Sequence, residues 1–264
     1  MRKLYIIEGL PCSGKSTTSA FVAEQLKTNS KVCFFDEGTG NHPADYEFSA
    51  FVNRQAFSGF SPDEQAEITA AGEQSAGGFI VPLSAFSGEL FDGLLQYKIY
   101  DFLPWETEYP VMLSKWRSFA GNADKAAVYV FNCVLMQNPM CETMMRFGFP
   151  LSKSLEYISA IAEIIKPLNP AVIYLKNDDI ADAVGKAARQ REDWLDGVID
   201  YHVNGAYGKS INAGGFDGYI SCLEERQRRE LEILPRLGIE SLVVDNPQRD
   251  WESAYRVIGE FLQD

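Results

Sequence analysis

The residues with the clearest chemical meaning form one short loop near the N-terminus. Gly9 and Gly14 have four residues between them, and Lys15 and Ser16 follow, which gives the pattern G-x-x-x-x-G-K-[ST]. Such loops bind phosphate, because glycine lets successive backbone amides converge on one anion. The lysine then lies across the β- and γ-phosphates of a nucleotide, and the hydroxyl binds Mg²⁺. The sequence therefore predicts an ATP-binding Walker A loop formed by Gly9, Pro11, Cys12, Ser13, Gly14, Lys15, Ser16 and Thr17.

A second Gly-Lys-Ser triplet, residues 208–210, lacks the rest of this pattern. Val203 stands where the first glycine would be, and no apolar strand leads into the triplet. We predict that this copy is a loop that binds no nucleotide.

Two adjacent carboxylates, Asp36 and Glu37, follow an apolar run at residues 31–35. A carboxylate at the carboxyl end of a strand faces the ligand crevice of an open α/β sheet. The alternative is that the pair caps a helix or is solvated on the following turn. His42 lies slightly further along the chain, and we interpret it as a histidine of a loop and not as a catalytic residue.

Cations gather after another apolar run, residues 171–175. Lys186 and Arg189 are three residues apart and share a helix face, and Arg191 reaches from the end of the same helix. One interpretation is that this cluster binds an anionic ligand, and the other is that it belongs to a surface helix with solvated cations. In a chain with a net charge of −13, we give the two interpretations equal weight.

Five short apolar runs would position these groups. They are rich in Val, Ile, Tyr or Phe and lie at residues 4–7, 31–35, 127–133, 171–175 and 241–244. Runs that are apolar on both faces are typical of parallel strands covered by helices on both sides. Amphipathic segments separate them, among them residues 151–165 and 251–262. The alternation predicts a doubly wound α/β fold with a five-stranded parallel sheet.

The gap between the second and third runs is too long for a plain crossover connection. Residues 38–125 contain fifteen Phe, Tyr and Trp residues, too many for a linker, and a capping box at residues 61–64 that starts a helix. We predict an ordered, mostly helical insertion that packs beside the carboxyl edge of the sheet. Most of its aromatics belong in its core, and two or three would line a substrate pocket. The whole chain, residues 1–264, is expected to form one domain.

Composition excludes several classes of protein. Hydrophobic residues make up 46% and charged residues 23% of the 264, as in a soluble globular protein. A net charge of −13 argues against binding to nucleic acid or to an anionic membrane. The five cysteines have no C-x-x-C spacing and there are two histidines, which argues against a disulfide framework or a zinc site. No apolar stretch approaches the ~18 residues of a membrane span. We expect a reduced, cytoplasmic protein.

These features together resemble the nucleoside and nucleotide kinases of the P-loop NTPase superfamily, and the thymidylate-kinase-like branch most. The resemblance implies a sheet order of 2-3-1-4-5, counting the five strands along the chain. It implies transfer of the γ-phosphoryl group of ATP, with Mg²⁺, to a small acceptor. In such kinases Glu37, or its rival Asp36, would contact the acceptor and serve as a base. Arg189 and Arg191 would lie on a mobile lid, residues 177–215, and stabilise the transferring group together with Lys15.

The third predicted strand departs from the pattern of this superfamily. It ends in Asn132 and Cys133, without the acid that usually holds the magnesium shell and without the Glu-Arg-Ser or Asp-Arg-Tyr triplet of the nucleoside and thymidylate kinases. Asn132 and Gln137 are oxygen-bearing substitutes, and Glu37 or Asp36 could supply the missing carboxylate. Because of this departure, the sequence does not identify the phosphoryl acceptor.

The sequence thus leads to an ATP- and Mg²⁺-dependent kinase for a small molecule, with a nucleoside or nucleotide among the candidate acceptors. One alternative is a kinase for another small alcohol, such as a sugar, a shikimate-like acid or an antibiotic. Another is a regulator that binds ATP as a signal and phosphorylates nothing. The sequence does not indicate an oligomeric state.

Overall fold

The computed structural model describes residues 1–75, 77–189 and 192–263. The chain forms two compact units, and each is described by itself. The sheet unit comprises Met1–Thr39 and Trp116–Asp264, and the insertion unit comprises Gly40–Lys115. The inserted segment packs around an apolar core of its own.

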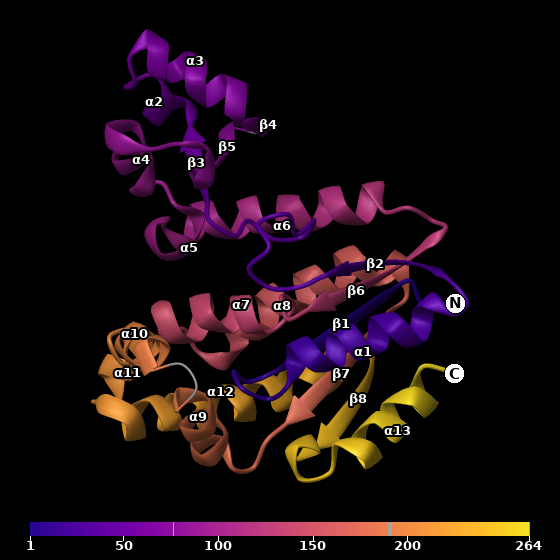
Figure 1. The fold of residues 1–264 in the computed structure, drawn as a ribbon. Helices are drawn as coiled ribbons and strands as arrows, with labels where there is room; N and C mark the ends of the chain where they lie inside the picture. The colour runs from indigo at the N-terminus through magenta and orange to yellow at the C-terminus, as the bar shows by residue number, and fades with distance from the viewer. Residues whose placement is uncertain (76, 190–191, 264) are drawn as a thin grey trace. The chain divides into compact units, whose positions relative to one another are not determined.

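The sheet unit is built on five parallel strands (Figure 1). Their spatial order is β2-β6-β1-β7-β8, so β1 is central. The strands are β1 (Leu4–Gly9), β2 (Lys31–Phe35), β6 (Ala127–Asn132), β7 (Pro170–Lys176) and β8 (Glu240–Asp245). All five segments predicted as strands are strands, and the predicted α/β fold with a five-stranded parallel sheet is confirmed.

Alternating side chains of the strands build two apolar layers. Tyr5 and Ile7 face one layer, which α1 (Lys15–Lys27) and α13 (Trp251–Phe261) cover. On the opposite face lie α8 (Leu151–Ile165) and α12 (Gly215–Ile233) (Figure 1). Tyr174 of β7 points to α12, where its hydroxyl donates to Glu230 at 2.6 Å. Both faces of the sheet are therefore covered, as the continuous apolar runs predict.

Short helices follow β6 and β7. After β6 come α7 (Gln137–Met140) and a π-helical turn (Cys141–Arg146). After β7 come α9 (Ile180–Ala188), α10 (Glu192–Val203) and α11 (Ala206–Ser210). Single turns of 3₁₀ helix complete the unit at Lys166–Leu168, Leu234–Arg236 and Pro247–Arg249. Val184, Val203 and Tyr219 form one apolar cluster with Leu10, which ties these helices to the loop after β1.

The second Gly-Lys-Ser triplet forms the end of α11, so the prediction of a loop at residues 208–210 is wrong. A Cβ at Gly208 would lie 2.5 Å from the carbonyl oxygen of Val203. The absence of a side chain there lets α11 pack closely against the end of α10. Packing alone therefore explains why residue 208 is a glycine, and no bound ligand is needed to account for it.

The insertion unit contains a three-stranded antiparallel sheet, which the expectation of a mostly helical segment missed. Its strands β3 (Ser49–Asn53), β4 (Glu73–Ser75) and β5 (Gly78–Pro82) lie in the order β3-β5-β4. The helices are α2 (Arg54–Phe57), α3 (Pro62–Ala71), α4 (Gly88–Leu95), α5 (Ile99–Phe102) and the first part of α6 (Trp105–Asn122), with a 3₁₀ turn at Leu83–Ala85. The predicted capping box is present, because Ser61 and Glu64 each accept from the other's backbone amide. Val52, Ile68 and Leu83 belong to a core of this unit alone.

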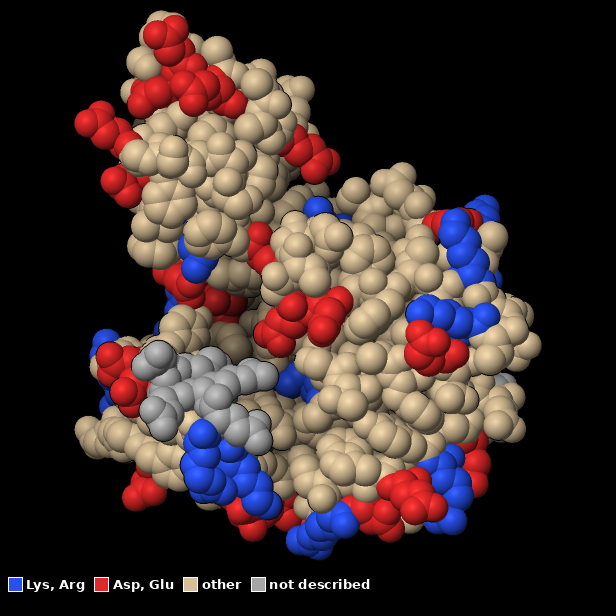
Figure 2. Space-filling model, viewed as in Figure 1, with Lys and Arg blue, Asp and Glu red and all other residues tan. Residues whose placement is uncertain are grey.

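The insertion unit has few basic residues, and its acidic residues therefore give it a net negative charge. It holds eleven of the 37 Asp and Glu residues but three of the 24 Lys and Arg residues. Figure 2 shows acidic side chains gathered over α3. This surface would repel polyanions, in line with the composition of the whole chain.

Candidate functional site

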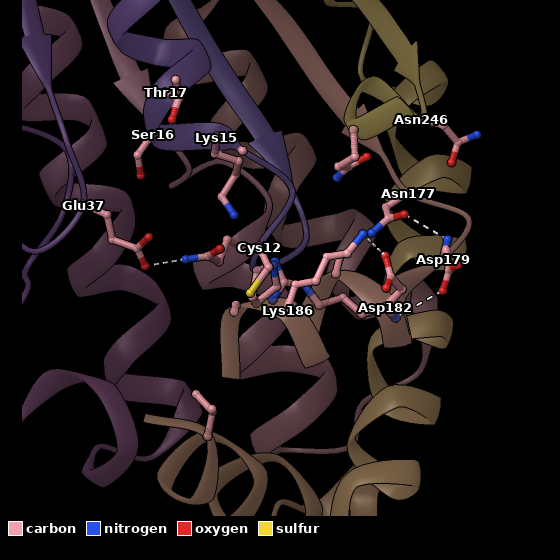
Figure 3. A pocket seen from close by; sticks show the side chains of 18 of the residues that line it. Cys12, Lys15, Ser16, Thr17, Glu37, Asn177, Asp179, Asp182, Lys186 and Asn246 are labelled. Carbon is pink, nitrogen blue, oxygen red and sulfur yellow. Dashed lines mark hydrogen bonds and ion pairs between the residues drawn. The ribbon is translucent and has the colours of Figure 1, made fainter. Parts of the chain in front are cut away.

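A cavity of about 780 Å³ in the sheet unit is lined by residues that follow each of the five strands (Figure 3). Lys15 follows β1, Glu37 follows β2, Gln137 follows β6, Asn177 follows β7 and Asn246 follows β8. The carboxyl ends of parallel strands meet at one edge of the sheet, so this is the crevice where an open α/β sheet binds its ligands.

The loop after β1 requires glycine at both glycine positions of its motif, Gly9 and Gly14. Gly14 adopts φ 93° as the N-cap of α1, and a Cβ there would lie 2.4 Å from Cη2 of Trp251. Gly9 adopts φ 143°, and a Cβ there would lie 2.6 Å from the carbonyl oxygen of Leu175. Both the backbone angle and the close neighbour exclude a side chain, so the loop depends on these glycines for its shape.

Lys15 is the first residue of α1 and is 7% exposed. Its Nζ donates to the carbonyl oxygen of Leu10 at 2.9 Å, within the same loop. Over the described residues, no side chain caps α1 and no acid lies in its first turn, so its first amides can donate to an anion. Six of the predicted loop residues line the cavity: Pro11, Cys12, Gly14, Lys15, Ser16 and Thr17. Gly9 and Ser13 are buried beneath them.

The two carboxylates that follow β2 have different partners. Asp36 Oδ1 accepts from Nδ2 of Asn132 at 2.5 Å, and the same Nδ2 lies 3.1 Å from Oγ of Ser16. Glu37 Oε1 accepts from Nε2 of Gln137 at 2.5 Å, and Glu37 lines the cavity. The amide of Asn132 therefore connects Asp36 with the loop hydroxyl of Ser16, whereas Glu37 lies on the cavity.

Ser16, Asp36 and Asn132 present a set of oxygens that suits Mg²⁺, which prefers hydroxyl, carboxylate and amide ligands together with water and phosphate. Oδ1 of Asn132 is buried and has no hydrogen-bond partner among the described residues. A buried oxygen without a partner is unfavourable unless an ion or a water molecule pairs with it. Among the described residues, no three His, Cys, Asp or Glu side chains form a metal-binding group of their own.

Glu8, the last charged residue of β1, is a functional candidate that the sequence analysis missed. Its carboxylate is fully buried and accepts from the backbone amides of residues 134–137, at 2.8–3.3 Å. Burial raises its pKa to about 7, although the amide of Met136 and the charge of Lys15 act to lower it. Glu8 thus holds the segment that carries Gln137, the partner of Glu37. A glutamate at the end of an apolar run gives no sequence signal for such a role.

The segment held by Glu8 has unusual backbone angles. Cys133 adopts φ 39° and Val134 adopts φ 151°, and the second value is rare for a β-branched residue. Such angles persist where the surroundings enforce them, and they gather at functional sites. The hydrogen bonds from four backbone amides to the carboxylate of Glu8 hold the segment in this conformation.

Residues after β7 and β8 form another part of the wall (Figure 3). Lys186 of α9 lines the cavity and pairs with Asp182 at 2.5 Å. Arg189, which follows α9, is exposed and is not among the described lining residues. Arg191 lies outside the described residues. Of the three predicted cations, the structure brings Lys186 to the cavity.

Asp178 and Asp179 stabilise the chain around the start of α9 through ion pairing and helix capping. Asp178 pairs with Lys176 at 2.9 Å and accepts from Asn246, and these contacts lower its pKa. Asp179 is the N-cap of α9 and accepts from the amide of Asp182 at 3.1 Å. His42 belongs to the insertion unit, where its Nδ1 accepts from the amide of Ala44 at 3.2 Å.

Two further polar residues of the wall, Arg226 and His202, were not predicted. Arg226 of α12 is buried and pairs with Glu230 through Nε at 2.6 Å. His202 of α10 is also buried, and its Nδ1 lies 2.8 Å from the carbonyl oxygen of Val198. They are separated in sequence and lie on different helices, so only the tertiary fold brings them to one cavity.

Comparisons with known proteins leave the family open. No family model matches the sequence, and a search of curated proteins finds no match. Among solved structures, the chain is similar to the YorR protein from Bacillus subtilis, crystallised in complex with phosphorylated GDP, at 14% identity and a TM-score of 0.39. The similarity covers 97% of this chain and 93% of that chain. A similarity of this size adds nothing to the assignment of function.

Over the described part of the chain, no helix is long and apolar enough to cross a lipid bilayer.

Proposed function

We propose that this chain is a P-loop kinase that transfers the γ-phosphoryl group of Mg²⁺-bound ATP to a small-molecule acceptor. One observation carries the proposal: Lys15 and Ser16, at the start of α1, line the same cavity as the carboxylate of Glu37. Phosphoryl transfer needs such an arrangement, because catalysis depends on positioning and on charge stabilisation. The sheet order β2-β6-β1-β7-β8, with the loop on the central strand, also supports it.

In this proposal the triphosphate lies across the amides of the loop, residues 9–17. Lys15 exchanges the carbonyl oxygen of Leu10 for the β- and γ-phosphates, and the first amides of α1 bind the same anion. Lys186 leaves Asp182 to add a second positive charge, and Arg189 and Arg191 serve as further lid cations. Asn177 and Asn246 form the wall against the nucleoside.

Ser16, Asp36 and Asn132 are the residues that would hold Mg²⁺ with the nucleotide. When bound, the ion neutralises charge on the β- and γ-phosphates. In this proposal Asp36 supplies the carboxylate that the end of β6 lacks. Its hydrogen bond to Asn132, which also contacts Ser16, supports this assignment.

Glu37 acts on the acceptor. The acceptor oxygen forms a bond to the γ-phosphorus, the bond from that phosphorus to the β–γ bridging oxygen breaks, and ADP leaves. The proton of the acceptor hydroxyl passes to Glu37 and then to solvent. Gln137 orients the carboxylate of Glu37 through its amide, and Glu8 fixes Gln137 in turn. We propose the insertion unit as a substrate region.

A screen with ATP labelled at the γ-position tests the proposal. The full chain is incubated with Mg²⁺ and with pools of nucleosides, nucleotides, sugars and other small alcohols. We expect transfer of label to at least one acceptor, and transfer that is about 10²–10⁴-fold slower with the Glu37→Gln variant. ATP that is bound but never consumed in any pool would contradict a kinase and favour a regulator that senses ATP.

A further inference from the structure

The ring of Trp251 packs against the loop after β1, residues 9–17, although Trp251 is not among the described residues that line the cavity. Trp251 is the first residue of α13, and Gly14 is the N-cap of α1, directly before Lys15. A Cβ at Gly14 would lie 2.8 Å from Cζ2 and 3.5 Å from Cζ3 of Trp251. The edge of the indole ring therefore fills the space in which a side chain of residue 14 would lie.

Two further aromatic rings hold this indole in place. The ring centroids of Trp251 and Tyr255 are 5.4 Å apart, and Tyr255 stacks on Phe21 of α1 with centroids 4.4 Å apart. All three rings pack against the same apolar layer of the sheet. Asp250 caps α13 by accepting from the backbone amide of Ser253 at 3.0 Å. Helix α13 thus contacts α1 at its N-cap and again about two turns later.

The segment that leads into α13 contacts the loop as well. Nε2 of Gln248 donates to the carbonyl oxygen of Ser13 at 3.3 Å. Asn246, two residues earlier, accepts from the backbone amide of Asp178 at 2.8 Å, which ties this segment to the chain that follows β7. Ser13 and Gly14 are neighbours in the loop, and both are therefore held by residues 248–251.

The backbone conformation at this point of the loop matters for binding an anion. Backbone amides bind one phosphate together only where their N–H groups converge. A loop that already has this conformation loses less conformational entropy when its ligand binds. Within the described residues no side-chain cap fixes the start of α1. The contact with Trp251 takes that role.

We propose that Trp251 is a positioning residue of the nucleotide site. Its indole ring holds Gly14 in place, so that the amides at the start of α1 converge on the phosphates before a nucleotide binds. Trp251 itself contacts neither the nucleotide nor the acceptor. The inference rests on the proposed function, because it assumes that the loop binds the phosphates of ATP.

Hydrogen exchange of the ligand-free chain tests the contact without any nucleotide. Trp251→Ala should speed exchange of the peptide that spans residues 10–18 about tenfold, which corresponds to the loss of an aromatic contact. Phe261→Ala is the matched control, because it removes a ring from the other end of α13, where Arg2 lies 4.5 Å from the ring centroid. This control should leave exchange of the loop unchanged. Equal exchange of the loop in wild type and Trp251→Ala would overturn the proposal.

Calorimetry with Mg²⁺–ATP measures the consequence for binding. At a temperature where both variants are folded, Trp251→Ala should bind about tenfold more weakly than wild type and Phe261→Ala within about threefold of it. Because both variants remove a ring from α13, the comparison separates positioning of the loop from stability of the helix. Equal losses in the two variants, or no loss in Trp251→Ala, would overturn the proposal.

The fluorescence of Trp251 gives a signature that a merely structural tryptophan would lack. The difference between the spectra of wild type and Trp251→Phe isolates its emission from that of the other three tryptophans. This emission should shift when Mg²⁺–ATP binds, because negative charge arrives next to the residue that the indole touches. Adenosine carries no phosphate and should leave the emission unchanged. An emission that stays constant at saturating Mg²⁺–ATP would overturn the proposal.

Lys15→Ala separates this inference from the proposed function. Mg²⁺–ATP binding that Lys15→Ala weakens and Trp251→Ala does not would refute the positioning role and leave the nucleotide site standing. Wild type that binds no Mg²⁺–ATP would refute the proposed function, while faster exchange of residues 10–18 in Trp251→Ala would still show that the ring fixes the loop.

Discussion

Asp36 and Glu37 show how two adjacent carboxylates take different tasks. Asp36 directly follows β2, and Glu37 lies in the turn that comes next. Asp36 accepts from Asn132, while Glu37 accepts from Gln137 and lines the cavity. The sequence analysis could name both acids as candidates, but it could not divide the two roles between them, because the partners, Asn132 and Gln137, lie about a hundred residues away in the sequence.

Replacing Glu37 tests its role as the base. Glu37→Gln keeps the size of the side chain and one hydrogen-bond acceptor but removes the negative charge. Turnover should fall about 10²–10⁴-fold, the usual contribution of a general base. Affinity for Mg²⁺–ATP should stay within about threefold, because the changed group faces the acceptor. Steady-state kinetics and ATP-binding isotherms measure the two quantities.

Asp36→Asn is the matched control for this change. Asp36 belongs to the proposed magnesium site, so its loss should weaken Mg²⁺-dependent ATP binding in addition to turnover. If Asp36→Asn left ATP binding intact and Glu37→Gln weakened it, the two assignments would have to be exchanged.

His202 should make stability depend on pH. The pKa of the folded state, about 4, lies below the ordinary 6.5, so the unfolded chain binds a proton that the folded chain excludes between these values. Stability is therefore complete above pH 6.5 and is lost as the pH falls toward 4. Between pH 7.5 and 5.0 this loss amounts to about 2 kcal/mol.

Comparison of wild type with His202→Phe isolates this contribution. The raised pKa of Glu8 acts in the opposite sense, since its folded carboxyl retains a proton up to about pH 7 and loses stability as the pH rises. The difference between the two proteins cancels that effect. Urea denaturation at both pH values should show wild type losing about 2 kcal/mol relative to the variant. A difference that does not change with pH would contradict a buried neutral imidazole.

At the scale of elements, Glu8 joins β1 to the segment that follows β6. Glu8→Gln keeps one acceptor oxygen, but its amide nitrogen would face the backbone N–H of Gln137. We expect a loss of about 1–3 kcal/mol in the free energy of unfolding, as for an unsatisfied buried group. Turnover should fall as well, because Gln137 no longer holds Glu37. Denaturation curves and kinetics measure the two effects.

A substitution at a second carboxylate, Glu64, tests whether the effect of Glu8 on turnover comes from positioning Gln137 or from a general loss of stability. Glu64 caps α3 in the insertion unit, so Glu64→Gln should change stability slightly and turnover not at all. If Glu8→Gln lost stability yet kept full turnover at a temperature where it is folded, Glu8 would have no positioning role.

The elements that could be predicted are those with a continuous signal. Each strand of the large sheet is an apolar run, and α8 and α13 have clear helical spacing. The strands β3, β4 and β5 have three to five residues each, so their alternation is too short to separate from helix or loop. The loop after β1 could be predicted because its chemistry is local. Glu8, His202 and Arg226 could not, because their partners are set by tertiary packing.

At the scale of the whole molecule, the proposed kinase function predicts that segments of the chain become more protected when both ligands bind. Hydrogen exchange of residues 40–115 and of α9 should slow when Mg²⁺–ATP and an acceptor are added together, if these segments close over the ligands. Each ligand alone should have a smaller effect. Mass spectrometry of peptides from both regions measures the change.

The sheet strands β6 and β7 provide internal references for this experiment. Both are regular and buried, and their exchange should change little. Equal protection of residues 40–115 with and without ligands would indicate a rigid structural insertion and exclude closure of this unit.

Binding of Mg²⁺–ATP to wild type, Lys15→Ala and Lys209→Ala tests the central claim most directly. Lys15 follows the glycine that starts α1, whereas Lys209 sits in the second Gly-Lys-Ser triplet, at the end of α11. The account predicts that Lys15→Ala weakens binding at least tenfold, which corresponds to about 1.4 kcal/mol, and that Lys209→Ala leaves it unchanged. Indistinguishable affinities for wild type and Lys15→Ala, or a loss confined to Lys209→Ala, would contradict a nucleotide site in the loop after β1.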